Sequence, residues 1–149
     1  MHRFPILFAL VSVLSSAELT LTGTWAGAKA ELPAGATVVL AVYDRDGTCC
    51  GGPAAALAGL GNLHTALNGK TDVRLVAIDV TVGATTEQAT AAAGLHHTEG
   101  IPLLVDGART TATALSLKID MTMTYVIRKP DGTQEVVHSP NQVKRRLGL

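Results

Sequence analysis

The sequence predicts a single α/β domain preceded by a short apolar leader. Nearly continuous apolar and β-branched runs at residues 37–44 and 73–80 are typical of strands buried on both faces of a parallel sheet. Leu- or Ala-rich stretches with helical spacing follow each of these runs. Such alternation of strands and helices favours a parallel sheet covered by helices, and 149 residues are enough for one domain of ordinary size.

The composition excludes several classes of function. Charged residues make up 16% of the chain, apolar residues 47%, and the formal net charge is zero. This balance does not describe a disordered charged chain, and it gives no electrostatic basis for binding nucleic acid. The sequence also lacks the motifs of serine hydrolases, zinc proteases and phosphate-binding loops. We therefore expect no nucleic acid partner and no cofactor.

Residues 1–17, MHRFPILFALVSVLSSA, have the pattern of a cleaved secretory signal peptide. A basic Arg3 precedes an apolar run, and the small residues Ser15 and Ala17 suit a signal-peptidase site. The run is shorter than the roughly 20 residues of a membrane span, so no stable membrane anchor is expected. The predicted organisation is a signal peptide at 1–17 and one domain at 18–149, exported to a periplasmic or extracellular, oxidising compartment.

Local signals define the remaining elements of the domain. Pro53 suits the first turn of a helix, which Gly59 and Gly61 should each weaken by roughly 1 kcal/mol relative to Ala. Thr85 and Gln88 have the spacing of a capping box. The expected elements are a short strand or hairpin at 18–27, strands at 37–44, 73–80, 101–106, 122–127 and 133–138, and helices at 53–69, 85–94, 108–117 and 139–149. The last two strands are joined by a Lys-Pro-Asp-Gly turn and should form a C-terminal hairpin.

This layout resembles thioredoxin-like domains of the extracytoplasmic redoxin type, close to TlpA-like thioredoxins and alkyl-hydroperoxide-reductase-type peroxiredoxins. Residues 19–44 resemble the family's N-terminal hairpin and first core strand, and residues 48–52 fall where it carries a Cys-x-x-Cys loop. Residues 101–117 and 121–132 are similar to two later segments of the family. The resemblance implies a central mixed sheet with flanking helices and a C-terminal β-hairpin. It also implies thiol–disulfide exchange with protein thiols or disulfides, or with small thiols.

The chain departs from the family's pattern at two positions. Gly52 replaces the second cysteine of the Cys-x-x-Cys loop, and Thr122 stands in place of the cis-proline beside the active site. A cis bond at a residue other than proline costs about 3 kcal/mol, so Thr122 is expected in the trans form. Both departures predict a reaction that differs from ordinary thioredoxin turnover.

Two adjacent cysteines, Cys49 and Cys50, are the candidate catalytic residues. Cys49 follows a buried strand and precedes a helix, where backbone N–H groups favour a thiolate, so it is the candidate nucleophile. Cys50 is the candidate resolving or switch thiol. A disulfide between the two would be strained, because adjacent Cα atoms lie about 3.8 Å apart and disulfides usually need about 4.4–6.8 Å.

Two other functions are open at this stage. Cys49, Cys50 and Met121 offer soft ligands that suit Cu(I), and copper chaperones of the Sco type resemble this fold, so the chain could be an exported Cu(I) carrier. Alternatively, it could be a redox-inactive interaction domain. The histidines do not add to a metal site: His64 is expected to be a half-buried core residue, and the His96–His97 pair an exposed polar loop.

Overall fold

The computed structural model describes residues 19–47, 52–119 and 123–149. Within these ranges no helix combines the length and apolar character needed to cross a membrane. The elements are β1 (Thr24–Trp25), β2 (Thr37–Tyr43), α1 (Gly52–Leu67), β3 (Val73–Asp79), α2 (Thr86–Leu95), β4 (Leu103–Val105), α3 (Thr110–Ala114), β5 (Thr124–Arg128), β6 (Gln134–Val137) and α4 (Pro140–Arg146).

The strands form one six-stranded mixed sheet in the order β1-β4-β3-β2-β5-β6. The three central strands β2, β3 and β4 run parallel, as their apolar sequences predict. β5 pairs antiparallel with β2, and β6 pairs antiparallel with β5, which confirms the C-terminal hairpin. The predicted α/β class and its central mixed sheet are therefore confirmed.

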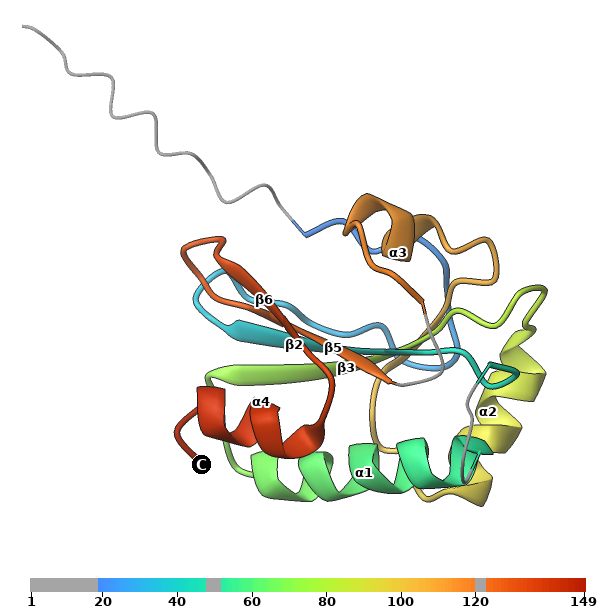
Figure 1. Cartoon of the computed structure of the whole chain (residues 1–149), viewed down its shortest axis with the longest axis horizontal. Coiled ribbons are helices and arrows are strands. Elements are labelled where there is room, and N and C mark those ends of the chain that lie inside the picture. Colours follow the sequence, from blue (N-terminus) through green and yellow to red (C-terminus); the bar gives the residue numbers. More distant parts are fainter. Residues whose placement is uncertain (1–18, 48–51, 120–122) are drawn as a thin grey trace, which may run out of the picture.

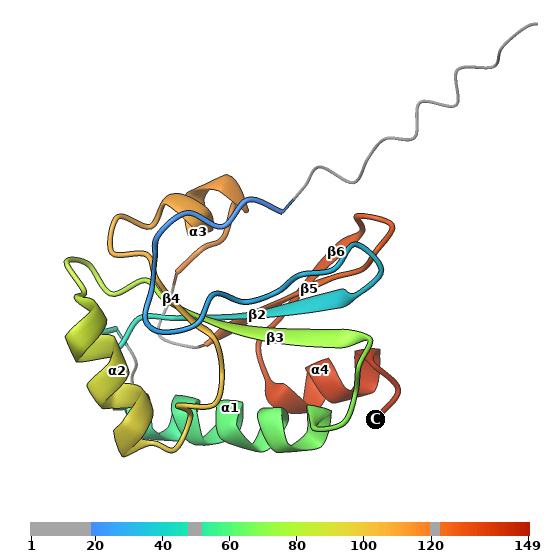
Figure 2. The ribbon, with the colours of Figure 1, turned by 180° about the vertical axis from the view of Figure 1, so that it is seen from behind.

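Helices cover both faces of the sheet, in agreement with the continuous burial of the central strands. Figures 1 and 2 show α1, α2 and α4 on one face, and α3 with the chain before β2 on the other. The first face is filled by Leu57, Leu60 and Leu63 of α1, Ala89 of α2 and Val143 of α4, all fully buried. The second face is filled by Val38, Leu40, Val42, Val76, Ile78, Val80, Leu104, Ala112 and Val126, with Leu19, Leu21 and Leu32 packed against them.

The N-terminal hairpin implied by the resemblance is absent from the described residues. Residues 19–36 contribute only the two-residue strand β1, which pairs antiparallel with β4 and not with a neighbour in sequence. Gly23 explains this pairing in part, because a Cβ there would lie 2.5 Å from the carbonyl oxygen of Val105. The chain approaches β4 so closely that only glycine fits at this position.

Helix caps follow the sequence signals closely. Thr85 accepts a hydrogen bond from the Gln88 N–H at 3.2 Å, and the Gln88 side chain accepts one from the Thr85 N–H at 3.2 Å. Ser139 caps α4 by accepting a hydrogen bond from the Gln142 N–H at 3.2 Å, with Pro140 in the first turn, and the Gln142 side chain accepts the His138 N–H. Helix α1 begins at Gly52, one residue before the proline that was expected to open it.

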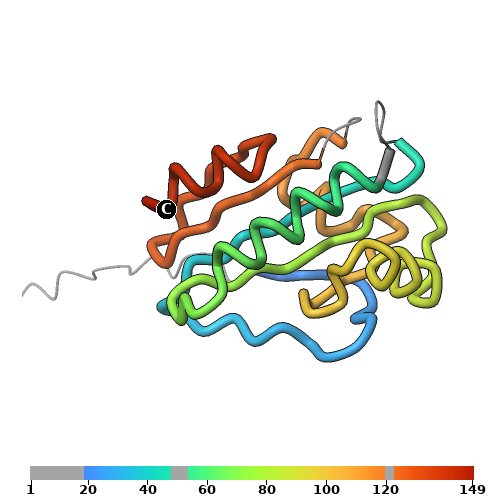
Figure 3. Tube along the Cα trace, turned by 90° about the horizontal axis from the view of Figure 1, so that it is seen from below, coloured from blue at the N-terminus to red at the C-terminus, as the bar shows by residue number. Residues whose placement is uncertain are grey.

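The two glycines inside α1 should respond differently to alanine. A Cβ at Gly59 would lie 3.1 Å from Cγ of Pro140, where α1 and α4 lie side by side (Figure 3), whereas a Cβ at Gly61 would meet its nearest neighbour at 3.9 Å. We expect Gly61→Ala to raise the free energy of unfolding by up to about 1 kcal/mol through helix propensity. Gly59→Ala should lose that gain to the contact with Pro140. Urea unfolding of both variants tests this, and an equal gain in both would contradict it.

Candidate functional site

The carboxyl ends of the three parallel strands meet at one edge of the sheet. β2 ends at Tyr43, β3 at Asp79 and β4 at Val105. The ladder continues past two of these ends, because Val80 N–H donates to the Tyr43 carbonyl and Asp106 N–H to the Asp79 carbonyl, both at 2.9 Å. In open α/β sheets this edge is where ligands and catalytic loops lie. We therefore take the carboxyl edge as the candidate site.

The segment that contains the two candidate catalytic cysteines follows β2 at this edge. Described chain ends at Gly47, four residues after β2, and resumes at Gly52, where α1 begins. Cys49 and Cys50 lie between these points and thus outside the described residues, as do Met121 and Thr122. The geometry of the site is therefore built from the residues that flank them.

An aspartate stands at the end of each parallel strand. Asp44 directly follows β2, Asp79 is the last residue of β3, and Asp106 directly follows β4. Asp79 and Asp106 are buried, and the Asp44 side chain is only 14% exposed. Buried carboxylates need partners, so the contacts of these three residues determine what the edge can do.

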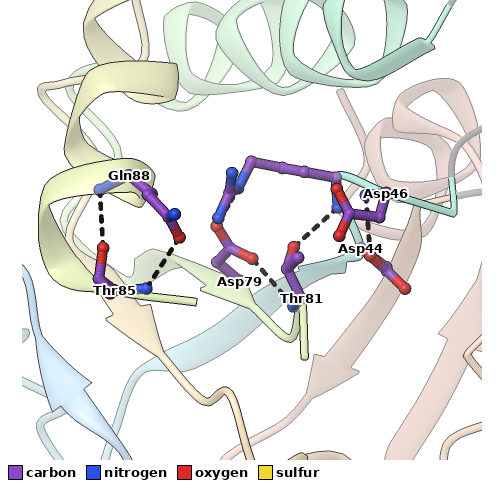
Figure 4. A network of polar contacts seen from close by, with 7 residues as sticks. Asp44, Asp46, Asp79, Thr81, Thr85 and Gln88 are labelled. Atoms are coloured by element: carbon purple, nitrogen blue, oxygen red, sulfur yellow. Dashed lines mark hydrogen bonds and ion pairs between the residues drawn. The ribbon is translucent and has the colours of Figure 1, made fainter. Parts of the chain in front are cut away.

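Asp79 is held by the turn after β2. Its Oδ2 accepts a hydrogen bond from Arg45 Nε at 2.6 Å, and its Oδ1 accepts the Thr81 N–H at 3.0 Å. The Thr81 hydroxyl in turn accepts the Arg45 N–H at 2.9 Å. Figure 4 shows Asp79 and Thr81 beside the turn that carries Asp44 and Asp46. Both the backbone and the side chain of Arg45 are therefore bound to the end of β3.

Asp44 is held by the chain before α3. Its Oδ2 accepts Arg109 Nη2 at 2.5 Å, and its Oδ1 accepts the Asp46 N–H at 2.9 Å. The Nε of Arg109 also donates to the Val80 carbonyl at 2.9 Å. One guanidinium thus joins the turn after β2 to the end of β3.

Asp106 caps α3. Its two carboxylate oxygens accept the N–H groups of Thr110 and Thr111, each at 2.9 Å. The Thr111 hydroxyl accepts the Thr22 N–H at 2.8 Å and donates to the Thr22 carbonyl at 3.0 Å. This aspartate therefore attaches α3, and through it the chain before β1, to the sheet.

All three aspartates are thus engaged in structural contacts, which limits the chemistry that the described residues can supply. Tyr43 adds no base either, because burial and the nearby Asp79 carboxylate raise its pKa far above its usual value, although Arg45 lowers it. A tyrosine with such a pKa stays protonated at neutral pH. The described part of the chain also contains no cluster of three or more His, Cys, Asp or Glu side chains able to hold a metal ion.

Among the histidines discussed above, His64 differs from its expectation. His64 is exposed, not half-buried, because the α1 position turned to the core is taken by Leu63. His96 and His97 follow α2 in a turn; His97 is exposed, as expected, whereas His96 is half-buried. Met123, directly before β5, is buried in the core on the face of the sheet that α1 covers.

Sequence reasoning missed the residues that organise the edge. Local sequence patterns give no site role to Arg45, Asp79 or Arg109. A usable signal is present in the sequence: the predicted strands at 37–44 and 101–106 end in aspartate, and the one at 73–80 has Asp79 as its penultimate residue. The carboxyl ends of parallel strands gather at one edge of a sheet. The two arginines carry no comparable signal, because their partners lie 34 and 65 residues away.

The sheet order and the placement of the helices on its two faces correspond to the thioredoxin-like fold that the resemblance implied. Solved structures share this fold. A secreted disulfide oxidoreductase of Mycobacterium tuberculosis, homologous to E. coli DsbE, has a TM-score of 0.58 and 17% identity, covering 76% of this chain and 81% of that chain. A thiol-disulfide oxidoreductase from Bacteroides fragilis has a TM-score of 0.59 and 16% identity, covering 77% and 82%.

StoA from Bacillus subtilis is a third such structure, with a TM-score of 0.55 and 14% identity over 74% of this chain and 81% of that chain. No protein-family model matches the sequence, and no curated protein matches it. The thioredoxin-like fold is thus supported by comparison of three-dimensional structures and not by a match of sequences.

Proposed function

We propose that this chain is an exported thiol–disulfide exchange protein in which Cys49 is the attacking thiol. One observation carries the proposal: within a thioredoxin-like fold, the two cysteines lie in the segment between the carboxyl end of β2 and the first residue of α1. The solved structures with this fold include proteins named as disulfide oxidoreductases. The pattern of residues 1–17 supports export.

The described surroundings support activation of the thiol by backbone dipoles more than by a neighbouring base. The carboxylates of Asp44, Asp79 and Asp106 are already bound, and Tyr43 is protonated at neutral pH. The 16-residue helix α1 begins three residues after Cys49, and N–H groups at a helix start favour an anion. We therefore expect the start of α1 to favour the thiolate form of Cys49, and the separation along the chain to weaken this effect.

The reaction proceeds by exchange of one disulfide for another. The Cys49 thiolate attacks one sulfur of a substrate disulfide, forming a mixed disulfide while the other substrate sulfur leaves as a thiolate and takes up a proton. A second thiolate, from a protein or a small thiol, then attacks the substrate sulfur and releases Cys49. Cys50 could release the substrate only by forming the strained ring between adjacent cysteines, so an external thiol is the favoured resolving agent.

Timed alkylation of the folded protein tests these roles. We expect iodoacetamide to modify Cys49 faster than Cys50 at pH 7, measured by peptide mass mapping of the parent, Cys49→Ser and Cys50→Ser. The same three proteins should be compared for reduction of a model protein disulfide with an excess of small thiol. Cys49→Ser should abolish the exchange, and Cys50→Ser should retain most of it.

The matched serine variants decide between the alternatives. Faster modification of Cys50, with exchange lost in Cys50→Ser, would reverse the two roles. Modification of both thiols only after unfolding would contradict the exchange function and favour a redox-inactive interaction domain.

A further inference from the structure

We propose that Arg109 is a positioning residue for the reactive thiol: by pairing with Asp44 it fixes the direction in which the cysteine segment leaves the sheet. This inference rests on the proposed function. Arg109 lies before α3, far along the chain from the cysteines, yet its side chain reaches the turn that directly precedes them.

The geometry of Arg109 shows that its guanidinium is held from two sides. Nη2 donates to Asp44 and Nε to the Val80 carbonyl, so the planar group is bound to the turn after β2 and to the end of β3 at once. Two donors of the same planar guanidinium fix its orientation, which a single hydrogen bond would not do. The Arg109 side chain is 31% exposed, so this clamp is accessible to substitution without opening the core.

The backbone of Arg109 provides a second observation. Its φ of 58° lies in the left-handed region, which is uncommon for residues other than glycine. Such a conformation persists where the surroundings fix it, and here the Arg109 N–H donates to the Asp106 carbonyl at 3.0 Å. The chain therefore adopts an unfavourable conformation at the residue whose side chain reaches the turn before the cysteines.

The turn at residues 44–47 is held by contacts with the Asp44 side chain. The Asp46 N–H binds Asp44, and a Cβ at Gly47 would lie 3.1 Å from Asp44 Oδ2, the atom that accepts Arg109. On the other side of the cysteines, α1 is fixed by its buried leucines. The described chain that precedes the four-residue interval 48–51 is thus held by Asp44 with Arg109.

Two variants can distinguish a positioning role of Arg109 from a direct effect of its charge on the Cys49 thiolate. Arg109→Asn removes the clamp and introduces a residue that tolerates a positive φ. Asp44→Asn weakens the same clamp but removes a negative charge and keeps an oxygen for the Asp46 N–H. If only charge mattered, losing the cation would disfavour the thiolate and losing the anion would favour it. If positioning matters, both variants change thiol reactivity in the same direction.

The experiment measures Cys49 alkylation against pH in the Cys50→Ser protein, together with hydrogen exchange of a peptide spanning residues 44–53. We expect Asp44→Asn and Arg109→Asn each to slow alkylation at pH 7 by about threefold or more, a size usual for coupled neighbours. The double variant should be no slower than the slower single variant. Amide exchange in the peptide should rise in all three. Arg146→Gln, which breaks the exposed pair with Glu135, is the matched control and should change neither quantity.

The outcomes separate this inference from the proposed function. The positioning role is overturned if the two single variants change alkylation in opposite directions. It is also overturned if Cys49 of the parent reacts but neither alkylation nor amide hydrogen exchange changes in the variants. Both results leave the thiol–disulfide exchange function standing. A folded parent whose Cys49 does not react overturns the proposed function, while faster amide exchange in both variants would still support the clamp.

Discussion

Arg45→Ala is expected to lower the free energy of unfolding by about 3–5 kcal/mol, because it leaves a buried carboxylate without its ion-pair partner. The Asp79 side chain is fully buried, and Arg45 Nε lies 2.6 Å from it. Removing one partner of such a pair is far more costly than removing both. Urea unfolding at pH 7, followed by the fluorescence of Trp25, the single tryptophan, measures the change.

Two further variants make this prediction specific. The double variant Arg45→Ala with Asp79→Asn should regain part of the loss, because an asparagine carries no charge and its oxygen can still accept the Thr81 N–H. Arg146→Ala breaks an ion pair of the same length whose side chains are 56% and 42% exposed, and should cost at most about 1 kcal/mol. Equal losses in Arg45→Ala and Arg146→Ala would show that burial of the pair does not matter.

The contacts at the carboxyl edge therefore both stabilise the fold and hold the chain that leads to the cysteines. Arg45 is bound to the end of β3 through both its backbone and its side chain, four residues before Cys49. Arg109 holds the preceding residue, Asp44, from the other side. The contacts that neutralise the aspartates also fix the start of the cysteine segment, so they leave no carboxylate among them to act as a base.

Local patterns predicted most of the fold because they depend on neighbours in sequence. After Thr37 the run at 37–43 is buried throughout, as its apolar sequence predicts, and it forms the inner strand β2. Thr85 and Gln88 form the capping box that their spacing predicts. The Lys-Pro-Asp-Gly turn joins β5 and β6, with the Gly132 N–H bound to the Lys129 carbonyl at 2.9 Å.

The features that the sequence could not predict depend on distant partners. β1 pairs with β4, about 80 residues away, because Gly23 lets the chains approach closely. The αL conformation of Arg109 and its pairing with Asp44 appear only once the two segments share an edge. The family resemblance pointed to the cysteine segment, but the polar contacts that hold the chain before it belong to the three-dimensional structure.

Leu57→Ala is expected to lower the free energy of unfolding by about 2–5 kcal/mol, the range seen when a buried leucine is truncated and leaves a cavity. Leu57 is fully buried between α1 and the sheet, near the helix end that follows the cysteines. Its loss should therefore also loosen the start of α1 and slow Cys49 alkylation at pH 7. Urea unfolding and timed alkylation of the same variant measure the two effects.

Leu95→Ala provides the matched control, because it makes the same truncation at the end of α2 in a side chain that is 73% exposed. That variant should change stability by no more than about 0.5 kcal/mol and leave alkylation unaltered. Loss of stability in Leu57→Ala with unchanged alkylation would mean that the reactivity of Cys49 does not depend on how firmly α1 is held. Reactivity would then have to be set from the Asp44 side of the segment alone, where the ion pair with Arg109 fixes the turn.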